Sequence, residues 1–261
     1  MTEFYESHAR IRPIPQQRVI EKMDEYMSRR DYAGAERHLL YWLEEARAGN
    51  DLRGALLVRN ELVGHYRKTG EREKALASAD DALKLLEALG FEGTISAGTT
   101  YVNIATALNA FDENGRALAL FEKAVPLYES SPATAPELLG GLYNNLALAC
   151  ASAGRFDEAM ALYEKAVARM ESAPHGALEI AVTRLNQANL TEARDGMEAG
   201  ERRIYALVDE AVALLDRPDL EHDGYYAYVC KSCVPTLEYY GYFDDARRLD
   251  EEAERIYGAG A

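Results

Sequence analysis

The fold of this chain is decided by one stretch, GLYNNLALACASAGRFDEAMALYEKAVARME, at residues 141–171. An altered copy, TYVNIATALNAFDENGRALALFEKAVPLYE, occupies residues 100–129. Ala117 and Ala159 hold the same place in the two copies, 42 positions apart. Self-similarity at a fixed spacing is typical of proteins that stack one structural unit. We therefore interpret the chain as an array of repeats.

The same small residue marks further copies, at Ala35, Ala75 and Ala246. The last step, from Ala159 to Ala246, is long enough to hold one more unit. The predicted organisation is a lead segment (1–15), a single solenoid (16–257) and a tail (258–261). Within the solenoid we predict six helical hairpins, at 16–49, 52–89, 95–130, 137–172, 177–216 and 224–257.

Glycine marks the turn between the two helices of several hairpins. Gly70, Gly154 and Gly241 each follow a first helix, and we expect Gly115 to act similarly in the third hairpin. The fifth hairpin is the weakest copy, with helices expected near 178–194 and 202–215. Its connection, residues 195–202, is longer than a tight turn, so we expect this hairpin to be splayed.

The apolar pattern within each copy has the period of a helix. In the first helix of the fourth copy, Tyr143, Leu146, Ala147 and Cys150 recur at i, i+3, i+4 and i+7. The chain is 48% apolar and rich in strong helix formers, whereas β-branched residues are sparse. The predicted fold class is therefore all-α, a solenoid of antiparallel hairpins. Ala159 is expected to let neighbouring backbones approach closely.

Charge and hydropathy argue against two classes of partner. The chain has 29 Lys and Arg against 44 Asp and Glu, a net charge of -15, which repels nucleic acids and anionic membrane surfaces. Apolar stretches such as 142–151 are shorter than a spanning helix needs, and the N-terminus does not look like a signal peptide. With three cysteines, an odd number, we expect a cytoplasmic protein.

Catalytic motifs are lacking in the sequence. The five histidines have no metal-ligand spacing, and no phosphate-binding loop, nucleophile elbow or dinucleotide fingerprint occurs. Cys230 and Cys233 form one CxxC, which can bind zinc or act as a redox pair. Both fall at apolar register positions, so buried packing is the favoured interpretation. We expect no metal, no cofactor and no enzymatic activity.

The repeat resembles the tetratricopeptide repeat. The resemblance covers about nine tenths of the chain and is strongest in the fourth copy, in which the family positions are held by Tyr143, Leu146, Ala147, Gly154, Phe156, Ala159, Tyr163 and Ala166. The long spacing and the Asn-Leu-Ala run are similar to the repeats of kinesin light chains and bacterial peptide-sensing regulators. The resemblance implies a right-handed superhelix whose first helices line a concave groove.

The groove that this resemblance implies is lined by residues one step from the core stripe. Its candidate ligand-binding residues are Asn60, Asn103, Thr106, Asn109, Asn144, Asn145, Asn186 and Asn189. Asn is a mediocre helix former, so this many Asn residues inside helices lower helix stability, and another interaction must offset the loss. One hypothesis is that the amides bond the backbone of an extended peptide, because each offers a donor and an acceptor. The other is that they bridge adjacent hairpins.

The charges of the groove favour a neutral or basic ligand. Some family members capture a C-terminal carboxylate with Lys and Arg, but the matching places here hold Ile20, Asp24, Asn60 and Glu61. Acidic groups such as Glu61 and Glu192 outnumber basic ones along the expected groove.

The last repeat is rich in tyrosine, and Tyr225, Tyr228, Tyr239 and Tyr240 form a candidate C-terminal interface. Packing against the preceding hairpin is the alternative. We predict a non-catalytic protein-protein interaction module that binds an extended peptide or protein segment in the groove. The alternatives are a self-associating scaffold, such as a homodimer built through terminal repeats or the convex face, and a sensor of peptides or small molecules.

Overall fold

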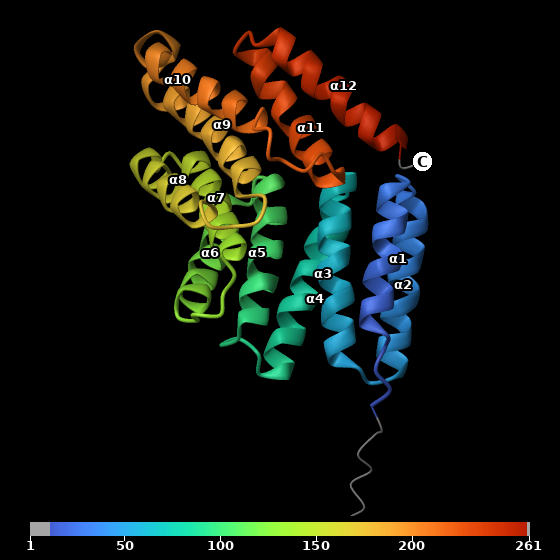
Figure 1. The fold of residues 1–261 in the computed structure, drawn as a ribbon. Coiled ribbons are helices and arrows are strands. Elements are labelled where there is room, and N and C mark those ends of the chain that lie inside the picture. Colours follow the sequence, from blue (N-terminus) through green and yellow to red (C-terminus); the bar gives the residue numbers. More distant parts are fainter. Residues whose placement is uncertain (1–10, 260–261) are drawn as a thin grey trace, which may run out of the picture. The chain divides into compact units, whose positions relative to one another are not determined.

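The computed structural model describes residues 11–259, and across them the chain forms twelve α-helices and no strand. Residues 1–10 of the predicted lead segment and 260–261 of the predicted tail lie outside the described residues. None of the described helices is long and apolar enough to cross a membrane. The prediction of an all-α repeat of helical hairpins is confirmed (Figure 1).

The chain divides into two compact units, one ending at Leu127 and the other beginning at Tyr128. The boundary falls near the end of α6, and the single solenoid over residues 16–257 stays a prediction. The helices of the first unit are α1 (Gln16–Ser28), α2 (Tyr32–Ala48), α3 (Leu52–Thr69), α4 (Arg72–Leu89), α5 (Ile95–Ala110) and α6 (Asn114–Glu129). Those of the second are α7 (Pro136–Ser152), α8 (Phe156–Met170), α9 (Gly176–Asp195), α10 (Met197–Leu215), α11 (Gly224–Tyr239) and α12 (Phe243–Ala259).

Each unit stacks its hairpins through consecutive helices and through the first helices of neighbouring hairpins. In the first unit α2 packs on α3, and α5 packs on both α3 and α4. In the second unit α9 packs on α7, α8 and α10, and α11 packs on α9 and α12. The first helices α3 and α5 therefore lie beside one another in the first unit, and α9 lies beside α7 and α11 in the second. A face shared between repeats requires this arrangement.

Aspartates begin three of the helices. Asp31, Asp51 and Asp223 accept backbone N–H bonds at the starts of α2, α3 and α11, which satisfies donors that have no partner inside the helix. Asp51 also accepts a bond from the Ile14 backbone N–H at 2.9 Å, and both residues are buried. One carboxylate thus caps α3 and anchors the segment before α1.

The expected glycine turns are present in three hairpins. Gly70, Gly154 and Gly241 have φ values of 76°, 75° and 85°, a left-handed conformation that glycine adopts without a side-chain clash. The expectation for Gly115 is wrong, because this residue lies in the first turn of α6. Asp112 takes the left-handed conformation there, with φ 62°, which a short polar side chain tolerates.

The expectation of a splayed fifth hairpin is also wrong. Only Gly196, with φ 82°, separates α9 from α10, and the two helices pack closely. A Cβ on Gly200 would lie 3.2 Å from Thr191 Cγ2 and 3.0 Å from Ile204 Cδ1. Glycine at position 200 therefore leaves room for the bulky side chain of Ile204. Ile204 is the counterpart of Ala159, because it lies seven residues before Ala211 just as Ala159 lies seven residues before Ala166.

Ala159 on α8 provides the sharpest test of the packing. Its side chain is fully buried, so Ala159→Glu would force a carboxylate into the hairpin core. We expect the free energy of unfolding to fall by at least about 3 kcal/mol. Urea denaturation followed by circular dichroism measures the change.

The matched control is Ala161→Glu, which places the same charge on the exposed side of α8 and should change the free energy of unfolding by no more than about 0.5 kcal/mol. Equal losses for the two variants would contradict the assigned register.

Candidate functional site

The first helices give each unit one polar face. In the first unit, the polar face consists of α3 and α5, with the start of α1 at its edge, and it carries Asn60, Asn103, Thr106 and Asn109. In the second unit, the polar face consists of α7, α9 and α11, and it carries Asn144, Asn145, Asn186 and Asn189.

The first-unit polar face contains a hollow of about 410 Å³. The Arg53 guanidinium lies over the Phe91 ring, 5.0 Å from its centroid, and both residues line the hollow. Such a contact between a cation and an aromatic face orients the guanidinium. Other lining residues are Gln16, Asn60, Glu61, Thr99 and Asn103.

Asn60 joins two hairpins within this face. Its Nδ2 donates to Thr100 Oγ1 at 2.9 Å, from α3 to α5. Its Oδ1 is buried and has no hydrogen-bond partner among the described residues, and the same is true of Asn109 Oδ1. A buried carbonyl oxygen without a donor is unfavourable, so neither amide has its full set of hydrogen bonds in this structure.

Glu61 adds negative charge beside Asn60. Burial raises the pKa of Glu61, and the nearby charge of Asp24 raises it further. The Glu61 carboxylate would therefore gain from a cationic neighbour, which would offset both effects.

The side chains of Thr106 and Asn103 differ in whether they make a hydrogen bond within α5. Thr106 Oγ1 donates back to the Val102 carbonyl at 2.8 Å, a bond within α5. Asn103 is exposed and lines the hollow. Asn103 is thus open to a ligand, whereas the Thr106 hydroxyl proton is already used.

An amide bridge crosses the second-unit polar face. Asn144 Oδ1 accepts from Asn186 Nδ2 at 3.3 Å, which joins α7 to α9. The same oxygen lies 3.3 Å from Thr183 Oγ1, whose one proton is shared with the Glu179 carbonyl at 2.9 Å. The Nδ2 group of Asn144 and the Oδ1 group of Asn186 take no part in these bonds. Asn145 is half-buried beside them. The bridge fixes the orientation of the two amides and leaves one polar group of each amide outside these bonds.

A second bridge joins α9 to Tyr240, the residue that follows α11. Tyr240 OH lies 3.0 Å from Asn189 Oδ1 and 2.9 Å from Glu192 Oε2 and shares its one proton between them. Tyr239 OH donates to Glu192 Oε1 at 2.7 Å. Burial and the bond to Glu192 raise the pKa of Tyr240, so its hydroxyl stays protonated. A hollow of about 630 Å³ lies here, lined by Asn189, Glu192, Ala193, Pro235, Thr236 and Tyr239.

The four tyrosines proposed as a C-terminal interface do not share one environment. Tyr240 is 4% exposed and packs inside the unit, as the alternative interpretation states. Tyr225 is 37% exposed and donates its hydroxyl proton to Glu179. Tyr228 and Tyr239 are 57% and 67% exposed. Only Tyr225, Tyr228 and Tyr239 therefore offer ring surface.

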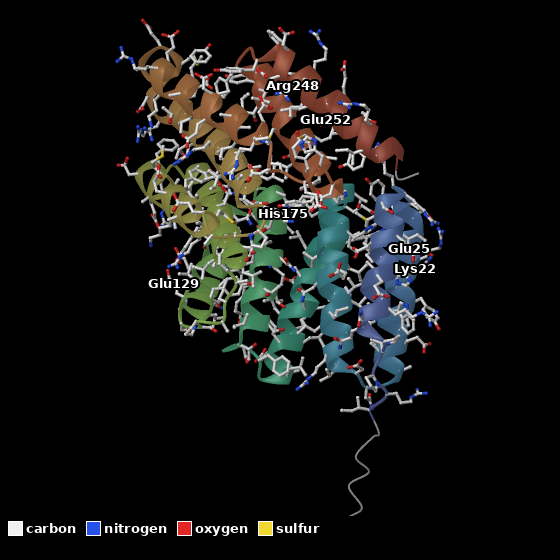
Figure 2. All side chains as sticks on the ribbon, viewed as in Figure 1. Lys22, Glu25, Glu129, His175, Arg248 and Glu252 are labelled. Atoms are coloured by element: carbon white, nitrogen blue, oxygen red, sulfur yellow. The ribbon has the colours of Figure 1, made fainter. Side chains whose placement is uncertain are left out.

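Charged groups on α12 also contact the connection that precedes the last hairpin. Arg248 lies 2.7 Å from Asp216, and Glu252 lies 2.6 Å from His222 Nδ1; Figure 2 labels Arg248 and Glu252. The His222 ring stacks on Tyr226 with centroids 4.1 Å apart. These contacts link α12 to the connection before α11.

Cys230 and Cys233 are buried, as their register positions predict. Burial raises the pKa of the Cys230 thiol to about 11 and that of the Cys233 thiol to about 12. Both thiols are therefore protonated at neutral pH, which suits packing rather than thiolate chemistry.

Sequence reasoning missed the hydroxyl partners of the amides. Thr100 lies 40 residues after Asn60, and Thr183 lies 39 residues after Asn144. Both separations are close to one repeat, so a search for polar residues one repeat apart would have found them. The spacing of the repeat does not predict the contact between Arg53 and Phe91, because Phe91 belongs to a connection between hairpins.

Comparison with known proteins identifies the fourth hairpin. Residues 140–173 match the model of the tetratricopeptide repeat family. A search of curated protein sequences gives no significant match.

Solved structures of helical repeat proteins are similar in fold. The structure of NprR in complex with its cognate peptide NprX aligns with a TM-score of 0.61 at 15% identity, over 91% of this chain and 66% of NprR. This chain thus spans just under two thirds of that protein. A Podospora anserina putative kinesin light chain with nearly identical TPR-like repeats aligns with a TM-score of 0.51 at 16% identity, over 77% of this chain and 94% of that one.

The hairpins and their shared faces define a helical repeat protein. More specifically, the chain has the TPR-like fold, with its clearest tetratricopeptide repeat at residues 140–173. Proteins of this fold are typically protein-protein interaction modules.

The hydroxyl of Tyr240 tests the bridge between α9 and α11. Tyr240→Phe removes only the oxygen that bonds Asn189 and Glu192, and we expect the free energy of unfolding to fall by about 1–3 kcal/mol. Tyr228→Phe is the control on an exposed ring and should change stability by no more than about 0.5 kcal/mol. Urea denaturation of both variants measures the difference, and a Tyr240→Phe variant as stable as the control would refute the bridge.

Proposed function

We propose that this chain is a non-catalytic interaction module that binds an extended peptide or protein segment along its polar faces. The observation that carries the proposal is the set of Asn amides on the first helices. Among the described residues, the buried Oδ1 atoms of Asn60 and Asn109 have no hydrogen-bond donor, and Asn103 is exposed and lines the same hollow as Asn60. An extended peptide presents N–H and C=O groups at regular intervals, which amides can bond whatever the peptide sequence.

The hairpin bridges support this function rather than compete with it. Asn144 and Asn186 bond each other through one group each, so their remaining groups are held in fixed directions. A side chain that is already ordered loses less conformational entropy when it binds a ligand. Asn189 is ordered in the same way by Tyr240.

The charge of the faces supports a neutral or basic partner. The charge of Asp24 lies close enough to Glu61 to raise the pKa of its carboxyl group. In the second unit, Glu192 lines the hollow beside Asn189 and Tyr239. A Lys or Arg side chain in the ligand would relieve the repulsion at Glu61. Peptide binding also agrees with the similarity to NprR, whose structure contains its cognate peptide. Three buried free cysteines are compatible with the proposed cytoplasmic location.

A selection from a random-peptide phage library, followed by fluorescence anisotropy with the selected peptides, tests the proposal. The test variant is the double substitution Asn103→Ala, Asn145→Ala, one change in each unit. We expect it to weaken binding by at least about tenfold, because each lost bond to the peptide contributes about 1 kcal/mol.

The control is the double substitution Glu87→Ala, Lys165→Ala on the exposed sides of α4 and α8, which should leave affinity unchanged. Circular dichroism checks that both double variants keep their helix content. Peptides that bind the wild type and the Asn103→Ala, Asn145→Ala variant equally well would contradict the proposal.

Self-association is the second candidate function, and exposed aromatic rings on the last hairpin favour it. Tyr228, Tyr239 and Phe243 are 57%, 67% and 62% exposed. Aromatic rings of this kind are enriched in protein interfaces. A homodimer through the last hairpin would cover them.

Light scattering over a range of protein concentrations tests self-association. A dimer formed through these rings should dissociate to the monomer mass of 29.0 kDa in a Tyr228→Ser, Phe243→Ser variant, because the substitutions remove apolar contact area. A Leu40→Ser, Tyr41→Ser variant is the control, since both side chains are exposed on α2. Monomeric wild-type protein at every concentration would exclude this function.

A further inference from the structure

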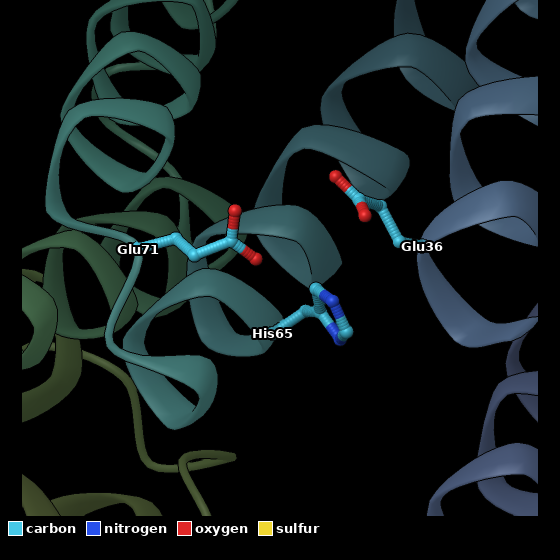
Figure 3. Close-up of side chains that lie close together, drawn as sticks. All are labelled: Glu36, His65 and Glu71. Carbon is cyan, nitrogen blue, oxygen red and sulfur yellow. The ribbon is translucent and has the colours of Figure 1, made fainter. Parts of the chain in front are cut away.

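A histidine and two glutamates meet between the first and second hairpins. Glu36 lies on α2, His65 on α3, and Glu71 immediately precedes α4. One possible ligand atom from each residue lies within 4.8 Å of the other two (Figure 3). Within residues 11–259 this is the one cluster of three or more His, Cys, Asp or Glu side chains with such geometry.

The imidazole of His65 is the unusual member of the cluster. The residue is only 3% exposed, and its Nδ1 is buried with no hydrogen-bond partner among the described residues. A buried ring nitrogen normally has a partner, because removing it from water without one is unfavourable. His65 therefore provides an observation, independent of the acidic groups, that points to a missing partner.

We propose that Glu36, His65 and Glu71 form a binding site for a first-row divalent transition-metal ion, with Zn²⁺ as the reference ion. One imidazole nitrogen and two carboxylate oxygens are ligands that Zn²⁺ accepts, and a fourth position stays open for water. Ligand atoms around tetrahedral zinc lie about 3.4 Å apart. The ligand atoms must approach one another by about 1.4 Å at the widest separation, which rotation of the glutamate side chains can supply.

Lys74 is the competitor for this site. Its Nζ lies 2.8 Å from Glu36 Oε1 and 2.5 Å from Glu71 Oε2, so one ammonium group contacts both carboxylates. A metal ion must displace this ammonium to reach the carboxylates. Lys74 therefore weakens metal binding in the wild-type chain, and its removal should strengthen it.

Two hydroxyl groups would support the bound carboxylates. Tyr66 OH donates to Glu36 Oε1 at 3.0 Å. Thr69 Oγ1 lies 3.2 Å from Glu71 Oε1 and shares its one proton between this oxygen and the His65 and Tyr66 carbonyls. Hydrogen bonds of this kind orient carboxylates that ligate metals. The ion would join α2, α3 and the start of α4, and so clamp the first hairpin to the second.

Isothermal titration calorimetry of the untagged full chain with ZnCl₂ tests the site. We expect one Zn²⁺ per wild-type chain and an affinity at least about tenfold weaker in Glu71→Gln and His65→Gln. We expect Lys74→Met to bind about tenfold more tightly than the wild type, because it removes the competing charge without removing a ligand. Substitution with Co²⁺ should give visible absorption that Glu71→Gln abolishes.

The control is His175→Gln, which removes an exposed histidine of the second unit and should leave Zn²⁺ affinity unchanged. Lys74→Met and Glu71→Gln do not alter the buried ring, so they test the site even if His65→Gln unfolds. If Lys74→Met binds Zn²⁺ no better than Glu71→Gln does, the cluster is an ion network centred on Lys74 and the proposal is wrong.

Discussion

Close packing of the second helix of each hairpin is the constraint on which the structure depends. Ala35, Ala75, Ala117 and Ala159 stand at equivalent places and are buried, so each hairpin can approach its neighbour within a unit. The fifth hairpin meets the same constraint differently, with Gly200 making room for Ile204. Because packing density in protein interiors is high, a larger group at any of these places would separate the helices.

This packing also sets the chemistry of the polar faces. Stacked repeats bring residues that lie about one repeat apart in sequence into contact, which is why Asn60 meets Thr100 and Asn144 meets Thr183. The two hypotheses for the Asn series are therefore compatible. A bridge occupies one polar group of an amide and orients the other, so the contacts that join hairpins also prepare a surface for a ligand.

Periodicity and turn residues suffice to predict most of the fold. The hairpin around Gly154 follows directly from an apolar stripe on each helix and a glycine between them. The fifth hairpin was misjudged because a single residue, Gly196, can reverse the chain, and its flanking polar residues look like a loop. Gly115 was misjudged because Asp112 can adopt the left-handed conformation that glycine usually supplies.

The polar faces could be predicted only in part. Family resemblance indicates which side of each first helix is polar, but burial depends on neighbouring hairpins, and so the sequence could not place Tyr240 inside and Tyr239 outside. The cluster of Glu36, His65 and Glu71 was missed for a similar reason. Its members come from three elements with irregular spacing, and only the packing of two hairpins brings them together.

The central claim is that the amides of the first helices contact a bound peptide. The most direct measurement is a titration of ¹⁵N-labelled protein with a selected peptide, followed through the side-chain NH₂ signals in the NMR spectrum. The account predicts that the signals of Asn103 and Asn145 shift in proportion to the bound fraction, while that of Asn50, on the connection between α2 and α3, stays in place. Shifts confined to residues of α4, α8 and α12, with the first-helix amides unchanged, would contradict it.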